Sequence, residues 1–308
     1  MDGLATYVEE STAPVRDKRR RISVYLGSAV LLAAASLVAV NSHGGNAPAK
    51  FPRVVAPGSS GLCSTPPNGF LFSQVVDGSQ MNVCISQQGN INQISYPDTA
   101  VGHTQIGFDG YCLFDLDDSS VYQDFSPGSG VANQGFSAAT MTQSASNIFN
   151  VTRTTTDNRY QLTEFIKINF QPRSVFVGMT VKNVSAVTRH VAAARYLAPA
   201  IDGSAADDQY NEFGGTGSGT GRTGQAFQGP PVGTNSLLFG ATQSGAETQT
   251  LAVSGFQAAN GCSGSARLDP PGPIGGGNRM FQALVNPFAH TLAPGASASV
   301  GKFVYRML

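Results

Sequence analysis

The residue with the clearest chemical potential is Glu164, because it interrupts an apolar strand face. In residues 159–170 apolar and polar side chains alternate with a period of two, and Glu164 falls on the apolar side. A carboxylate there must be paired, hydrogen-bonded or turned toward a cavity, so we expect a partner such as Arg195 from the strand at 189–197. Glu164 could then hold a hydroxyl group of a ligand. The alternative is a strand end that opens to water, or a bulge that turns Glu164 outward.

Histidine could supply a general base, and His103 is the best candidate because it lies in a loop between two expected strands. His190 alternates with Val191 in an expected strand, which favours a structural role. His290 follows the end of a strand, which favours a surface turn. No G-x-S-x-G motif is present, so a hydrolase built on serine, histidine and aspartate has no support.

Two groups of acidic residues could contact a ligand. Asp109 precedes the acidic run from Asp115 to Asp118, and carboxylate oxygens are ligands that calcium prefers. The spacing is not that of an EF-hand, and exposed acids beside a strand explain the run equally well, so we predict no metal site. The second group lies in the long loop at 202–235, before its glycine-rich run, where it could cover one end of the domain. Its candidate ligand-binding residues are Asp207, Asp208, Tyr210 and Glu212.

Residues 219–224 match G-x-G-x-x-G formally, with the sequence Gly-Thr-Gly-Arg-Thr-Gly. A dinucleotide site needs a strand before this motif and a helix that starts on it, and the sequence predicts neither. We therefore expect a flexible loop here and no cofactor.

The four cysteines are the candidates for disulfide bonds: Cys63, Cys84, Cys112 and Cys262. An even number of cysteines favours disulfides if the chain is exported, and three connectivities are possible. The spacings do not match a zinc site. Buried free thiols are the alternative.

The first 62 residues predict export. Residues 1–21 form a basic segment that ends in Arg19-Arg20-Arg21, and residues 22–40 contain no charge. Nineteen helical residues span about 28 Å, roughly one hydrocarbon thickness, and the positive cluster would keep the N-terminus in the cytoplasm. The helix is either a cleaved signal or an uncleaved membrane anchor, and residues 41–62 read as a linker. The domain would lie in the periplasm or outside the cell, either secreted or anchored.

The remaining residues, 63–308, predict an all-β domain. Strands are expected at 70–76 and 81–86 around an Asp77-Gly78 turn, and at 91–95, 111–116, 159–170 and 174–184. Further strands are expected at 189–197, 236–242, 249–257, 279–285 and 297–306. No amphipathic helix of useful length follows residue 45, so two packed antiparallel sheets would bury these strands.

Several short motifs resemble one family of β-sandwich domains. These are Gly89-Asn-Ile-Asn-Gln-Ile-Ser-Tyr-Pro-Asp98, Gly107-Phe-Asp-Gly-Tyr111, and the segments at 159–165, 174–183 and 195–203. Their order resembles the N-terminal β-sandwich of bacterial glycoside hydrolase family 15 proteins, the glucoamylases and glucodextranases, over residues 65–306. This resemblance implies a galactose mutarotase-like supersandwich and a carbohydrate context. In that family the catalytic acids lie in a helical barrel after the sandwich, and the chain ends at Leu308 without one, so the resemblance does not imply a hydrolase.

The charge composition argues against one class of function, nucleic-acid binding. Lysine plus arginine and aspartate plus glutamate both number 19, so no basic surplus favours nucleic acid. We therefore expect an exported, non-catalytic, carbohydrate-binding or glycan-associated β-sandwich, with membrane contact through residues 22–40 if these are retained. A structural or assembly protein of the cell envelope is the main alternative, and an epimerase or lyase that uses Glu164 with a histidine is the other. The lack of tryptophan argues against a dedicated sugar-binding module.

Overall fold

The structure is a computed structural model. It describes residues 69–96, 106–126, 129, 131–201, 209–213, 223–227, 236–241, 246–252, 279–285 and 290–308. The chain divides into two compact units, Met1–Pro48 and Ala49–Leu308, and all described residues belong to the second. The basic segment, hydrophobic helix and linker expected at 1–62 lie outside the described residues. Among those residues, no helix has the length and apolar character needed to cross a bilayer.

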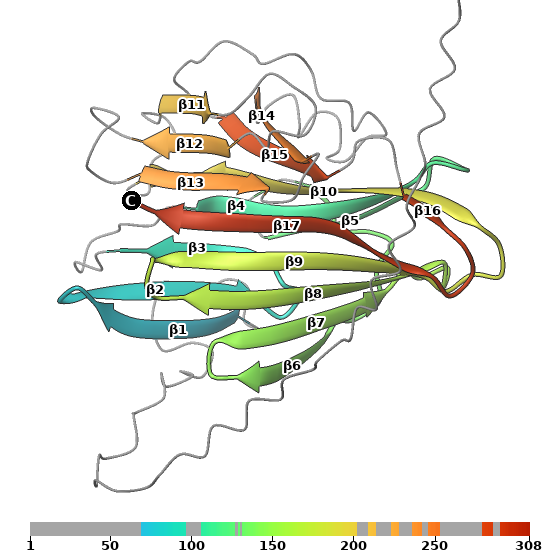
Figure 1. Ribbon diagram of the computed structural model, residues 1–308, viewed down its shortest axis with the longest axis horizontal. Coiled ribbons are helices and arrows are strands. Elements are labelled where there is room, and N and C mark those ends of the chain that lie inside the picture. The colour runs from blue at the N-terminus through green and yellow to red at the C-terminus, as the bar shows by residue number, and fades with distance from the viewer. Residues whose placement is uncertain are drawn as a thin grey trace, which may run out of the picture. The chain divides into compact units, whose positions relative to one another are not determined.

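The described residues form an all-β domain of three antiparallel sheets, which confirms the expected fold class (Figure 1). The smallest sheet contains β1 (Gly69–Val76), β2 (Ser79–Ser86) and β3 (Ile91–Ser95). The six-stranded sheet runs in the order β14 (Ala246–Ala252), β15 (Arg279–Val285), β10 (Arg189–Pro199), β4 (Ile106–Asp115) and β5 (Val121–Phe125), and β16 (His290–Leu292) also pairs with β10.

The eight-stranded sheet is the widest layer. Its order is β11 (Gln209–Phe213), β12 (Thr223–Phe227), β13 (Ser236–Ala241), β17 (Ser297–Met307), β9 (Ser174–Asn183), β8 (Tyr160–Asn169), β7 (Ile148–Thr154) and β6 (Thr140–Ala145). In Figure 1, β17, β9, β8 and β7 run side by side across the view, and β10 and β4 lie in another layer. One core cluster joins residues of all three sheets, including Val83 of β2, Leu113 of β4 and Ile166 of β8.

The turns follow the local sequence. The hairpin between β1 and β2 turns at Asp77 and Gly78, whose φ angles of 50° and 80° are those of a type I′ turn. The expected Asp-Gly hairpin is therefore confirmed.

The smallest sheet packs on the eight-stranded sheet, because the ring centre of Phe72 in β1 lies 4.6 Å from that of Phe149 in β7.

Most expected strands are present with small shifts in their ends. The strands predicted at 91–95 and 279–285 coincide with β3 and β15, and β8 and β9 differ from prediction by one residue at one or both ends. The strand predicted at 111–116 begins earlier, at Ile106, where Gly107, Asp109 and Gly110 weaken the apolar pattern. β5, β6, β7, β11, β12 and β16 were not predicted.

Candidate functional site

Arg195 stands at the centre of a buried ionic network between the two large sheets. In β10 it pairs with Tyr111 of β4, so Asp109 lies two residues along β4 on the same face. Its Nη2 donates to Asp109 Oδ2 at 2.5 Å, and its Nη1 donates to Glu164 Oε1 at 2.7 Å from β8 of the opposite sheet. All three side chains are sealed from solvent. The expected partnership of Glu164 with Arg195 is thus present, and Asp109 joins it.

Asp109 receives more hydrogen bonds than any other carboxylate of this network. Besides Arg195, the hydroxyl of Tyr305 donates to its Oδ1 at 2.5 Å, and the amide of Ile91 donates to its Oδ2 at 2.8 Å. Tyr305 in turn accepts from Nε of Arg195. Burial raises the pKa of Asp109, while Arg195 and these donors oppose that rise. Donors to both oxygens stabilise the ionised form, so Asp109 is the counter-charge of Arg195.

Glu164 is held more weakly and carries a proton near neutral pH. Its Oε2 is buried and has no hydrogen-bond partner among the described residues. Burial raises the pKa of Glu164 to about 8, with Arg195 opposing the rise and Asp109 adding to it. A protonated Glu164 leaves one positive and one negative charge in the centre, which avoids an uncompensated buried charge.

A second buried pair continues the network toward β5 and β7. Arg153 of β7 contacts Asp124 of β5 and donates from Nη1 to the hydroxyl of Tyr111 at 3.0 Å. The side-chain amide of Asn90 donates to Asp124 Oδ1 at 2.7 Å. The guanidinium of Arg153 also lies 4.8 Å from the ring centre of Phe136. Polar contacts therefore join the two sheets at two adjacent places.

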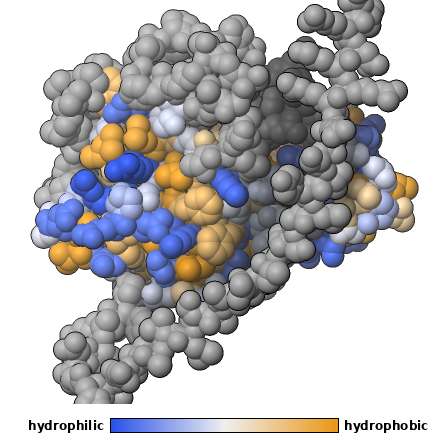
Figure 2. Space-filling model, viewed as in Figure 1, coloured by the Kyte–Doolittle hydropathy of each residue, from blue (hydrophilic) through white to orange (hydrophobic). Residues whose placement is uncertain are grey.

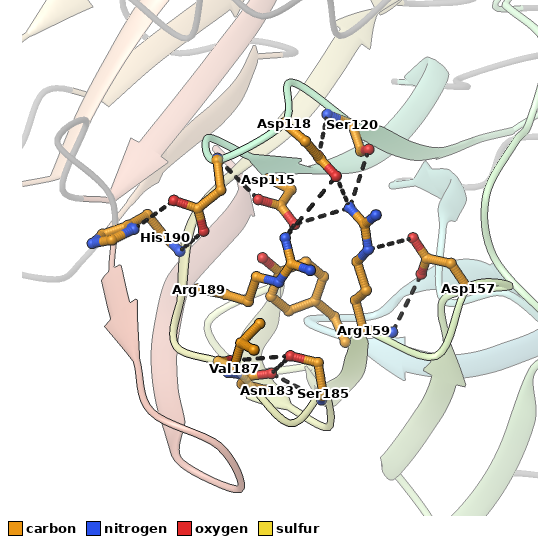
Figure 3. A network of polar contacts seen from close by, with 12 residues as sticks. Asp115, Asp118, Ser120, Asp157, Arg159, Asn183, Ser185, Val187, Arg189 and His190 are labelled. Carbon is orange, nitrogen blue, oxygen red and sulfur yellow. Dashed lines mark hydrogen bonds and ion pairs between the residues drawn. The ribbon is translucent and has the colours of Figure 1, made fainter.

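A third network lies nearer the surface, at the end of the sandwich drawn in Figure 3. Asp115 is buried, and its Oδ2 accepts from Arg159 at 3.3 Å and from Arg189 at 3.2 Å. Asp118 also contacts Arg159, and Asp157 lies 3.2 Å from Nε of Arg159. Three acids thus share two arginines, and these ion pairs connect the turns at this end of the domain.

The structure gives no support to a calcium site among Asp109, Asp115, Asp117 and Asp118. Asp109 pairs with Arg195 in the core, whereas Asp115 pairs with Arg159 and Arg189. Asp117 accepts from the His190 ring at 2.7 Å, and this hydrogen bond lowers its pKa. Among the described residues no group of acids, histidines and cysteines could hold a metal ion.

The other candidate residues are dispersed or lie outside the described part of the chain. His103, Asp207 and Asp208 are outside it. Tyr210 is buried in β11, with its ring 5.6 Å from that of Phe281, and Glu212 lies in the same strand.

Cys84 and Cys112 are both buried, and neither is a free thiol. Cys63 and Cys262 lie outside the described residues, so a disulfide framework stays a prediction.

The outer face of the eight-stranded sheet presents an aromatic pair, with one ring exposed and the other half-buried. Phe165 of β8 is 37% exposed, and its ring centre lies 6.2 Å from that of Phe176 in β9, in an edge-on arrangement. Gly178, paired with Phe165, has no side chain, and the ring of Phe176 packs over it, 3.4 Å from an ideal Cβ. Asn150 and Lys302 lie in the same row across the sheet as Phe165, and the half-buried Val304 lies opposite Phe176. In Figure 2, hydrophobic and hydrophilic residues are mixed on the visible face.

Sequence reasoning missed several members of these networks. Arg153 follows the buried Phe149 and Val151 on the inward face of β7, so the period-two argument that found Glu164 could have found it. Tyr305 and Tyr111 carry no such signal, because an inward tyrosine is ordinarily a core residue.

No protein-family profile matches the sequence, and no curated protein matches it. Solved structures with a similar fold include a bacterial glucoamylase complexed with acarbose, at 9% identity over 74% of this chain and 30% of that chain, with a TM-score of 0.47. A proposed aldose 1-epimerase from Escherichia coli K12 matches at 9% identity over 78% of this chain and 99% of its own, with a TM-score of 0.42.

An α-galactosidase from Geobacillus stearothermophilus in complex with raffinose matches at 9% identity, over 77% of this chain and 40% of that chain, with a TM-score of 0.40. The chain spans less than a third of the glucoamylase. Any assignment of function rests on the geometry of this chain itself.

Proposed function

We propose that this chain is an exported, non-catalytic β-sandwich that binds carbohydrate on the outer face of its eight-stranded sheet. The observation that carries the proposal is the aromatic pair on this face, in which Phe165 is 37% exposed and Phe176 is half-buried. Aromatic rings offer an apolar surface on which the CH groups of a pyranose can pack, while flanking amides and hydroxyls hydrogen-bond its OH groups. Asn150 and Thr163 supply such groups beside Phe165.

The geometry of Glu164 supports a non-catalytic role. Acid–base chemistry on a sugar needs a carboxylate that a substrate can reach, and Glu164 is only 1% exposed. Among the described residues its hydrogen-bond partner is Arg195, and the described His190 is hydrogen-bonded to Asp117 instead. The buried network of Glu164, Arg195 and Asp109 therefore holds the two large sheets together. A ligand would be contacted by outward-facing side chains instead. Export rests on the charge-free segment at 22–40 after a basic one.

A glycan array probed with the full chain, followed by titration of the best ligand, tests this function. The Phe165→Ala variant should raise Kd about fivefold, because an aromatic contact contributes about 1 kcal/mol. Leu116→Ala is the matched control, since Leu116 is also exposed, at 47%, but follows β4 in the other sheet. Unchanged thermal melts would show that both variants fold. Absence of glycan binding, or equal losses in the two variants, would refute the proposal.

A second candidate, protein assembly, is favoured by β6. This strand ends the eight-stranded sheet, and its side chains are exposed except for the half-buried Met141. No described strand pairs with its other edge, and such an edge can accept a strand from a partner. Light scattering at rising concentration would detect self-association, and Thr142→Lys should abolish it by placing a charge on the edge.

A further inference from the structure

The outer face of the eight-stranded sheet carries charges of one sign. The face is defined by the outward side chains of β6, β7, β8, β9 and β17, all of them described. Its charged residues are Lys167, Lys182, Lys302 and Arg306. The only carboxylate in these five strands is Glu164, and it points into the core. Near the ends of the face, Asp77 contacts Gln171 at one turn, and Asp157 pairs with Arg159 at another.

The strand register places these cations around the aromatic pair. Lys167 lies opposite Phe176, and Phe176 lies opposite Val304, two residues from Arg306 on β17. At the other end of β9 stands Lys182, opposite Gln161. Ser174, which pairs with Arg306, is eight residues from Lys182 along β9, so the basic positions extend over roughly 27 Å at about 3.4 Å per residue.

We propose that this face selects acidic polysaccharides, polymers whose sugar rings carry carboxylates. The inference rests on the proposed carbohydrate-binding function and adds the chemical class of the ligand. A glycan chain lying along β9 would place acidic groups near Arg306 and Lys167 at one end and near Lys182 at the other. The sugar rings between them would lie over Phe165 and Phe176. The absence of outward carboxylates from these five strands removes the repulsion that an acidic ligand would otherwise meet.

The spacing of the charges favours a polymer over a small anion and a glycan over a nucleic acid. A single small anion cannot reach two basic positions separated by roughly 27 Å. A phosphate backbone is bound by proteins with a basic surplus, whereas this chain has 19 basic and 19 acidic residues and no net charge. Outward threonines such as Thr163 and Thr180 suit the hydroxyl groups of sugars.

The test is fluorescence anisotropy of the full chain with labelled polygalacturonate oligomers, and with dextran oligomers of equal length as the neutral probe. Wild type should bind polygalacturonate more tightly than dextran, and added NaCl should weaken binding to the acidic probe. The triple variant Lys167→Gln, Lys182→Gln, Arg306→Gln should lose affinity for polygalacturonate about tenfold or more and keep its affinity for dextran. The matched control, Lys167→Arg with Lys182→Arg, keeps the charge and should bind as wild type.

Other outcomes separate this inference from the function on which it rests. Equal affinity for dextran and polygalacturonate, with a loss in Phe165→Ala, would overturn the charge selection and leave carbohydrate binding standing. Binding to neither probe, with no ligand on the array, would overturn both. Tighter binding to a single-stranded oligonucleotide than to polygalacturonate would overturn the inference in favour of a nucleic-acid surface.

Discussion

Gly89 lies so close to Glu164 that an ideal Cβ at residue 89 would stand 1.9 Å from Oε2 of that carboxyl group. Gly89 also has a φ of 93°, which L side chains rarely adopt. Its carbonyl oxygen accepts from Nη2 of Arg195 at 3.1 Å. The turn between β2 and β3 therefore closes one side of the buried ionic centre, and glycine is required there for two separate reasons.

Replacement of Gly89 by alanine should destabilise the domain more than the same change at Gly78. Both glycines have positive φ, so each substitution should cost about 1–2 kcal/mol in backbone strain. An added Cβ at Gly78 meets nothing within 4 Å, whereas at Gly89 it must displace Glu164, which adds about 1–3 kcal/mol. Urea melts of both variants measure the difference. Equal losses would show that Glu164 moves aside freely.

The stability contributed by Glu164 should fall as pH rises from about 4.5 to about 8. Burial raises its pKa from 4.5 to about 8, so in this window the unfolded chain loses the proton while the folded chain keeps it. Proton release then favours the unfolded chain, and the effect levels off above pH 8. The Glu164→Gln variant has no such proton. The free energy of unfolding of the variant should therefore fall below that of wild type by more at pH 5 than at pH 8, and a constant difference would contradict the assignment.

The fold could be read from the sequence wherever one strand face is apolar. β8 and β9 alternate cleanly, and the Asp77-Gly78 turn marks its hairpin. β6 escaped prediction because all its side chains except the half-buried Met141 are polar or small and exposed, so no apolar face marks the strand. β4 was predicted too short because its first half buries Asp109 among glycines, and that carboxylate is stabilised by partners distant in sequence.

Part of the buried network was also predictable, because its charged residues stand out on apolar strand faces. Glu164 and Arg195 are charges in apolar strands, and such charges must find each other when the strands belong to facing sheets. Tyr305 is 110 residues from Arg195, and only the register of β17 brings it to the network. The outer face was invisible as a site, because Phe165 and Phe176 read as ordinary strand residues until the register placed them together.

Oxidation should stabilise the domain. Cys84 and Cys112 are buried and not free, and the sequence holds two further cysteines outside the described residues. A disulfide contributes about 2–4 kcal/mol by restricting the unfolded chain. Thermal melts should therefore show a lower Tm after reduction with dithiothreitol. Mass spectrometry of an unreduced digest identifies the pairs, and four unlinked cysteine peptides would contradict the prediction.

Asp109→Asn should destabilise the domain by about 1–3 kcal/mol, because buried Arg195 and Tyr305 lose the carboxylate that they both contact. Asp118→Asn is the control, since Asp118 is 37% exposed in a surface ion pair, and should cost no more than about 1 kcal/mol. Circular dichroism during urea unfolding measures both changes.

The double variant Asp109→Asn with Glu164→Gln tests how the two carboxyl groups share Arg195. In Asp109→Asn, Glu164 can ionise and replace the lost charge, because its Oε1 already lies 2.7 Å from Nη1 of Arg195. In the double variant no carboxylate contacts Arg195 within the described residues, so the guanidinium stays buried without a counter-charge. The double variant should therefore lose more stability than the sum of the single variants, by about 0.5–3 kcal/mol. Additive losses in urea melts at pH 7 would mean that Glu164 does not respond to the charge state of Asp109.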